Sequence, residues 1–130
     1  MATVKKDTTY ARNEKHVFEC DLTYVISKIE GRWKLQLLSK LEEGKFRFTD
    51  LKKEFSFITE RMLTLQLKAL EQDGLIKRTA YAEVPLRVEY ELTTMAAELF
   101  PIFKQLSEWG SKHRALSLTK HKISRSPANY

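Results

Sequence analysis

The stretch FTDLKKEFSFITERMLTLQLKALEQDG, residues 48–74, decides the fold because it predicts two helices separated by a tight turn. Thr49 is a residue type that often caps a helix, and it would begin a first helix of about two turns. Residues 56–58 form the turn, Thr59 caps the second helix and Gly74 ends it. A short helix, a tight turn and a second helix are typical of the helix-turn-helix motif.

The second helix has one apolar face and an opposite face of a different kind. At about 100° per residue, Leu63, Leu67 and Leu70 share one side and are expected to be buried. The opposite side, called the reading face below, carries Arg61, Leu65, Lys68 and Gln72, with Thr64 at its margin. The second helix of a helix-turn-helix lies in the major groove with its N-terminal part nearest the base edges. We therefore predict that the reading face contacts double-stranded DNA.

The candidate DNA-binding residues of this helix have distinct roles. Arg61 and Lys68 can reach phosphates or guanine edges, and the alternative for both is a solvated helix surface. Thr64 can bond a base edge or a phosphate, and Thr59 at the cap is a further candidate. Leu65 can touch a thymine methyl, or it could pack on a neighbouring element.

A β-hairpin is predicted after Gly74. Residues 75–81 (LIKRTAY) and 87–92 (RVEYEL) have the composition of strands, and Pro85 between them cannot lie in a central strand. The hairpin tip is expected at residues 83–86, which makes the hairpin the wing of a winged helix. Arg87 lies beside the tip and is predicted to contact the minor groove or a phosphate, with pairing to Glu89 or Glu91 across the hairpin as the alternative.

Two more helices and a short strand are predicted before residue 48. CDLTYVISKIEG (20–31) and WKLQLLSKLEEG (33–44) each have apolar residues at helical spacing and end on glycine, and KFRF (45–48) alternates like a strand. Arg32 and Lys34 flank the start of the helix predicted at residues 33–44. We treat both as candidate phosphate contacts, although surface charge is the alternative.

A last long helix is predicted from Thr93 or Thr94 to about Ser111, with a kink at Pro101. Its apolar residues form two neighbouring stripes, which a chain of this size cannot cover by itself. A partner helix from a second copy is the simplest cover, and the alternative is one wide core face. The predicted dimer-interface residues are Met95, Leu99, Ile102, Phe103, Leu106 and Trp109.

Composition limits the class of protein. The 130 residues suit one domain, with an arm or extra helix at 1–18, the winged helix-turn-helix with its C-terminal dimerisation helix at 19–111, and a basic, frayed tail at 112–130. The net charge of +6 favours polyanionic partners. One cysteine fits a reducing cytoplasm, and we expect no secretory signal and no membrane association.

Enzyme chemistry is not expected. His16, His113 and His121 lie far apart, no spacing suits zinc, and no glycine-rich phosphate loop occurs. We therefore predict no catalytic residues, no metal and no cofactor, and the sequence points to no particular small-molecule effector.

Several segments together resemble a known family. EGRWKLQLLSKL, RFTDLKKEFSFITERMLTLQLKALEQDGLIKR, YAEVPLRVEYELT and SEWG are similar to HxlR-type winged-helix transcription regulators of bacteria, which are MarR-like, between Cys20 and Gly110. The resemblance implies a homodimer that binds near-palindromic DNA, and a final helix that helps form the dimer. It also implies that the position of Cys20 can serve as a sensor of oxidants or electrophiles. The chain departs from the family pattern at Asp21 and Leu86, where prolines are usual, and at Leu65, which is usually polar.

Cys20 lies at the predicted start of a helix, where peptide N–H groups favour a thiolate. The neighbouring carboxylates of Glu19 and Asp21 act in the opposite direction, so the sequence leaves the direction of the pKa shift open. A redox sensor and a structural cysteine both remain possible roles.

The sequence thus predicts an α+β, mostly helical fold: a winged helix-turn-helix with additional N- and C-terminal helices that form a dimer interface. The predicted function is that of a sequence-specific, double-stranded-DNA-binding transcriptional regulator. The alternative is a winged-helix module that binds a protein or RNA and does not read DNA. Cations on the reading face favour the first function, and acidic or apolar residues there would favour the second.

Overall fold

The computed structural model describes residues 20–124 of the protein, with side chains as far as Thr119. The chain divides into two compact units, residues 1–93 and residues 94–130. We describe each unit by itself.

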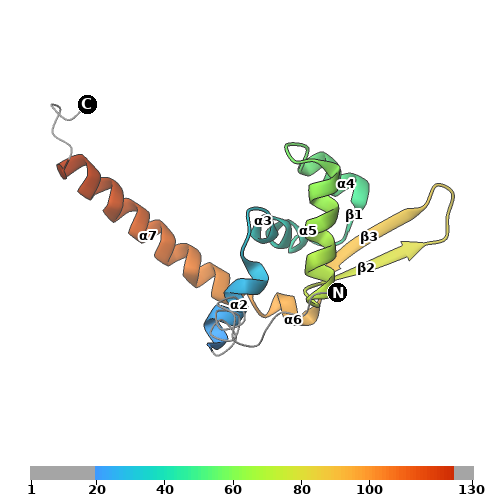
Figure 1. Ribbon diagram of the computed structural model, residues 1–130, viewed down its shortest axis with the longest axis horizontal. Coiled ribbons are helices and arrows are strands. Elements are labelled where there is room, and N and C mark those ends of the chain that lie inside the picture. Colours follow the sequence, from blue (N-terminus) through green and yellow to red (C-terminus); the bar gives the residue numbers. More distant parts are fainter. Residues whose placement is uncertain (1–19, 125–130) are drawn as a thin grey trace, which may run out of the picture. The chain divides into compact units, whose positions relative to one another are not determined.

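The first unit has the predicted order of elements (Figure 1). Two helices precede the short strand, the helix-turn-helix follows, and the hairpin comes last. The elements are α2 (Asp21–Ile29), α3 (Lys34–Leu41), β1 (Phe46–Arg47), α4 (Phe48–Glu54), α5 (Glu60–Gln72), β2 (Ile76–Tyr81) and β3 (Arg87–Leu92). This arrangement confirms the predicted winged helix-turn-helix.

Leucines from three helices form the core of this unit. The buried side chains include Leu37, Leu38 and Leu41 of α3, Leu51 of α4, and Leu63, Leu67 and Leu70 of α5, and Ile76 and Tyr90 join them from the sheet. Complete burial of a leucine contributes about 1.5–3 kcal/mol, so the apolar faces explain why the helices pack against one another. The predicted buried face of α5 is confirmed.

Both ends of α5 are capped as predicted. The hydroxyl oxygen of Thr59 accepts a hydrogen bond from the backbone N–H of Met62 at 3.0 Å. At the other end, the N–H of Gly74 donates to the carbonyl of Glu71 at 3.0 Å, and the N–H of Leu75 donates to the carbonyl of Leu70 at 2.9 Å. Gly74 has φ +73°, which makes this end a Schellman motif. The chain therefore leaves α5 sharply and enters β2.

The predicted start of the first motif helix at Thr49 is wrong. The helix α4 begins at Phe48, and the extended residue Arg47 is its N-cap. The carboxylate of Asp50, at the third helical position, accepts a hydrogen bond from the backbone N–H of Arg47 at 3.3 Å. Because Asp50 supplies this acceptor from within the helix, the helix can begin directly at the end of β1.

The three strands form an antiparallel sheet in the order β1-β3-β2. The short strand β1 pairs only with Glu89 and Tyr90 of β3. The outer part of the hairpin, closed by the Tyr81–Arg87 pair, is therefore a two-stranded ribbon that extends beyond β1 (Figure 1). This ribbon is the predicted wing.

The second unit differs from the prediction of one kinked helix ending near Ser111. It contains α6 (Thr94–Ala97) and α7 (Phe100–Ser124), with a complete break between them. Pro101 lies in the first turn of α7, where its missing N–H would have no intrahelical partner, so proline favours a new start over a kink. The helix α7 also continues through most of the segment predicted to be frayed, and between Ser111 and Ser124 it contains neither glycine nor proline.

Candidate nucleic-acid interface

The reading face of α5 is exposed along its length. Arg61, Lys68 and Gln72 are exposed, and Leu65 has 50% of its surface accessible. Between residues 20 and 119 the structure shows no ion pair to Arg61 or Lys68, whereas four other lysines of the first unit each pair with a carboxylate. Those lysines are Lys28, Lys40, Lys45 and Lys52. The cations of the reading face are therefore available to an external anion.

Ion pairs connect both ends of α5 to other helices of the first unit. At the N-terminal end, Nζ of Lys52 on α4 lies 2.8 Å from Oε2 of Glu60. At the C-terminal end, Nζ of Lys28 on α2 lies 3.5 Å from Oδ1 of Asp73. The first pair also neutralises the carboxylate that precedes Arg61, which removes a repulsion for an approaching phosphate.

The two threonines of this region have different hydrogen-bonding capacity. The hydroxyl of Thr64 donates to the carbonyl oxygen of Glu60 at 2.8 Å. While its proton is used in this way, Thr64 accepts a bond from a base amino group, and donation to a phosphate would require the bond to Glu60 to break. Thr59 accepts from Met62, so its own hydroxyl proton is available to a phosphate oxygen.

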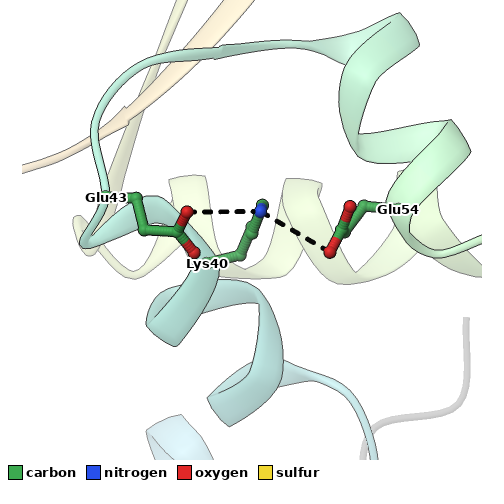
Figure 2. A network of polar contacts seen from close by, with 3 residues as sticks. All are labelled: Lys40, Glu43 and Glu54. Atoms are coloured by element: carbon green, nitrogen blue, oxygen red, sulfur yellow. Dashed lines mark hydrogen bonds and ion pairs between the residues drawn. The ribbon is translucent and has the colours of Figure 1, made fainter.

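An ion-pair network holds α4 against α3 (Figure 2). Nζ of Lys40 lies 3.3 Å from Oε1 of Glu43 and 3.5 Å from Oε1 of Glu54. Partial burial disfavours the charged ammonium, but the two carboxylates outweigh it and raise the pKa of Lys40. The network supports the helix on which the turn and the reading helix depend.

Arg32 is linked to the turn of the motif through the ring of Trp33. The guanidinium carbon of Arg32 is 5.2 Å from the ring centroid of Trp33, whose ring is 5.2 Å from that of Phe57 in the turn. Arg32 is exposed, and Lys34 is half-buried at the first position of α3. Trp33 therefore connects Arg32 to the segment that precedes the reading helix.

Arg87 interacts with its own hairpin. Its Nη2 lies 3.1 Å from Oε1 of Glu83, and its Cζ lies 3.9 Å from the ring centroid of Tyr81 directly across the hairpin. The glutamate partner is Glu83 at the tip. The expected partners Glu89 and Glu91 lie on the same strand as Arg87, so the alternative of pairing with them across the hairpin is wrong. The apolar side chains of Val84 and Leu86 are left exposed at the tip.

A concave cleft of about 500 Å³ lies between the starts of α4 and α5 and the inner side of the hairpin. Its lining includes Thr49, Thr64 and the three arginines Arg47, Arg78 and Arg87. Arg47 and Arg78 were not predicted as site residues from the sequence. The signal for Arg78 was strand alternation, since it shares a face with the buried Ile76.

The comparisons with known proteins agree with this geometry. Residues 28–117, well over half of the chain, match the HxlR-like helix-turn-helix family. The chain belongs to the HxlR family. BH0655 of Halalkalibacterium halodurans, described as an uncharacterised HTH-type transcriptional regulator, is 42% identical over 106 residues, 81% of this chain and 94% of the relative. YdeP of Bacillus subtilis, described in the same way, is 43% identical over 95 residues, 73% of this chain and 74% of the relative.

Solved structures extend the comparison of this HxlR-family chain. The redox regulator HypR in its reduced form has a TM-score of 0.70 at 39% identity, covering 77% of this chain and 99% of HypR. The reduced form of the transcriptional regulator YodB from B. subtilis has a TM-score of 0.66 at 28% identity, covering 72% of this chain and 92% of YodB. The similar proteins are therefore winged-helix transcriptional regulators. HypR is described as a redox regulator, and both the HypR and the YodB structure are of the reduced form.

In this HxlR-family chain, Cys20 is the exposed N-cap residue of α2. The Thr23 hydroxyl, followed by the backbone N–H groups of Thr23 and Leu22, favours the thiolate and lowers the pKa of the thiol. Slight burial and the charge of Asp21 act in the opposite direction and are outweighed. The sequence left this direction open, and Glu19 lies outside the described residues.

The predicted dimer residues lie on α6, on α7 and between them. Met95, Ile102, Leu106 and Trp109 have half or more of their surface exposed, and Leu99 and Phe103 are half-buried. The spacing of four and three residues continues beyond the predicted helix end. The ring of His113 stacks on Trp109 at 5.0 Å, and Leu116 is 62% exposed. These residues were missed because the helix was expected to stop at Ser111.

Residues 20–124 contain no group of three histidine, cysteine or acidic residues that could hold a metal ion. None of the helices there combines the length and apolar character needed to cross a bilayer.

Proposed function

We propose that this HxlR-family chain is a sequence-specific regulator of transcription that binds a near-palindromic operator in double-stranded DNA as a homodimer. The observation that carries the proposal is the reading face. It presents Arg61 and Lys68 without an acidic partner among residues 20–119, on a helix that is capped at both ends and joined by ion pairs to α4 and α2.

In this proposal α5 enters the major groove with its N-terminal half nearest the bases. Arg61 donates to a guanine edge or a phosphate, and Lys68 binds the backbone further along the helix. Thr64 accepts from a base amino group, because its proton is already donated to Glu60. Leu65, exposed between the cations, contacts a thymine methyl.

The homodimer rests on the apolar side chains of the second unit. Ile102, Leu106 and Trp109 follow one another at helical spacing and are exposed. An apolar stripe of this length on one helix is costly in water, and a second copy of the same helix is the partner of matching chemistry. A two-fold dimer would present two reading helices to half-sites about 10 bp apart, or a multiple of that spacing.

Cys20 is the proposed point at which a thiol-reactive signal acts. It is exposed, and its neighbours stabilise the thiolate, which is the reactive form. The chain has one cysteine, so two-electron oxidation can form a mixed disulfide with a small thiol or a Cys20–Cys20 bond between subunits. Further two-electron oxidations of the same sulfur give the higher oxides, and an electrophile forms a direct adduct with the thiolate. The solved relative HypR is described as a redox regulator, which supports the same use here.

The test begins with a duplex selected by the wild-type protein from a random library. Binding of Arg61→Ala to that duplex should be weaker by on the order of 1–3 kcal/mol if Arg61 reads a base. If Arg61 meets only phosphate, affinity should fall equally for selected and scrambled duplexes. Lys77→Ala is the matched control, because Lys77 is an exposed cation away from the reading face. Wild-type affinity from Arg61→Ala would contradict the assignment, and a preference for RNA or protein over duplex DNA would favour the alternative module.

A further inference from the structure

The cleft beside the reading helix contains charges that the function above does not use. It lies between the start of α4, the start of α5 and the inner side of the hairpin, entirely within the first unit. Its charged lining residues are Arg47, Arg78, Arg87, Glu60 and Glu83. Three arginines therefore face two glutamates in this lining, and the ion pairs of the glutamates decide the net charge of the cleft.

Both acidic residues of the cleft are neutralised by near neighbours. Glu60 pairs with Lys52 at 2.8 Å, and Glu83 pairs with Arg87 at 3.1 Å. For Arg47 and Arg78 the structure shows no ion pair within residues 20–119. The cleft therefore keeps an excess of positive charge, which suits an anion from outside the chain.

The strand register places Arg78 in this cleft. Arg78 lies opposite the buried Tyr90 of β3, and both residues line the cleft. The preceding residue, Lys77, lies opposite Glu91 and is not part of the lining. Successive side chains of a strand point to opposite faces, so only Arg78 of this pair of cations faces the reading helix.

We propose that this cleft holds a phosphodiester of the DNA strand that passes between the reading helix and the wing, with Arg78 as its principal cation. The proposal rests on the proposed function and adds a residue to it. A planar guanidinium can donate two parallel hydrogen bonds to phosphate oxygens. The apolar residues Val84, Pro85 and Leu86 line the same cleft and suit the faces of deoxyribose.

This contact would position the protein and would not read sequence. Phosphate contacts fix the register and orientation of a protein on the duplex, while base-edge contacts select the sequence. Because Thr64 of the reading helix also lines the cleft, a phosphate held there lies next to the part of α5 that meets the bases. Arg78 is thus a positioning residue for Arg61 and Leu65.

The test compares Arg78→Ala with Lys77→Ala on the selected duplex and a scrambled duplex of equal length, over a series of salt concentrations. Arg78→Ala should weaken both duplexes by the same factor, leave their affinity ratio unchanged, and reduce the slope of log K against log salt by about 0.9 for each subunit's phosphate contact, or about 1.8 for the dimer. Lys77→Ala should keep the wild-type slope. Arg78→Lys should keep the slope but bind more weakly than wild type, since it retains the charge without the paired donors. Thermal unfolding should be the same for all three variants, because both side chains are exposed.

The possible failures are distinguishable. Equal slopes for wild type, Arg78→Ala and Lys77→Ala would overturn this inference while leaving the proposed function intact. A loss confined to the selected duplex would also overturn it, because Arg78 would then read a base. Displacement of DNA by inorganic phosphate at constant ionic strength, in wild type but not in Arg78→Ala, would reveal a site for a free anion instead. If wild type binds no duplex, the proposed function fails together with the inference.

Discussion

The guanidinium of Arg87 forms an ion pair with the carboxylate of Glu83 at the wing tip, with Nη2 and Oε1 3.1 Å apart. The pair closes the loop between the two strands of the ribbon. It also places an acidic side chain at the part of the wing that would approach DNA. The wing arginine therefore braces the tip in the free protein, and any contact with DNA competes with this pairing.

Glu83→Gln should strengthen duplex binding, because it removes a negative charge from the wing and releases Arg87 for a phosphate. The stability cost should be below about 1 kcal/mol, since Glu83 is half exposed and exposed ion pairs contribute little. Fluorescence anisotropy and thermal unfolding measure the two quantities. Weaker binding by Glu83→Gln would show instead that the bonded tip is the conformation that meets DNA.

Thr59→Ala should destabilise the folded protein by about 1 kcal/mol, because the backbone N–H of Met62 loses its acceptor at the start of α5. Thr59→Ser keeps a hydroxyl in the same place and should be close to wild type. Urea denaturation of the three proteins gives the comparison. If the alanine variant matched the serine variant, the cap would contribute nothing to the reading helix.

Leu106→Glu should convert a dimer into a monomer of 15.3 kDa, because it places a charge in the apolar stripe of α7. Lys104→Glu is the control, since Lys104 is exposed and lies about 160° away around the helix at 100° per residue. Light scattering coupled to size exclusion gives the masses. A wild-type monomer at micromolar concentration that binds DNA one to one would exclude the proposed assembly.

Thr23→Val should raise the pKa of the Cys20 thiol, because the hydroxyl that stabilises the thiolate most strongly is lost. Alkylation by iodoacetamide follows the thiolate fraction, so its rate profile should rise at lower pH in folded wild type than in the urea-unfolded chain. In Thr23→Val the rise should move to higher pH. Coincident profiles for folded and unfolded wild type would mean that the helix start does not activate the cysteine.

The same cysteine can be tested as a switch. Operator binding by wild type should change after diamide, while Cys20→Ser should bind equally before and after treatment. Equal responses from the two proteins, or no response from either, would dismiss Cys20 as the sensor.

Local rules predicted the parts of the fold that depend on neighbouring residues. Thr59 begins α5 and Gly74 follows its last turn as expected, because capping depends only on the residue type and on the adjacent turn of the helix. The leucine faces were predicted for the same reason, since helical spacing alone brings Leu63, Leu67 and Leu70 together. The start of α4 was missed because Asp50 caps it from the third helical position.

The candidate site was predicted only in part. The reading face follows from one helix, so Arg61 and Lys68 could be named from spacing. The cleft could not be predicted in this way. Arg47 and Arg78 are brought together because β1 and β2 both pair with β3, and the spacing of residues along the chain does not indicate that pairing. The bond from Arg87 to Glu83 depends on the conformation of the tip, and the break before Pro101 depends on where the new helix begins.

The most direct test of the central claim is to sequence genomic DNA fragments retained by wild type and by the double variant Arg61→Ala/Lys68→Ala, with Lys77→Ala as control. The account predicts that wild type and Lys77→Ala enrich the same fragments, which share a near-palindromic sequence with half-sites about 10 bp apart or a multiple of this. The double variant should lose that enrichment while remaining folded. Equal enrichment by the double variant, or fragments with no common sequence from wild type, would contradict the claim that α5 reads DNA.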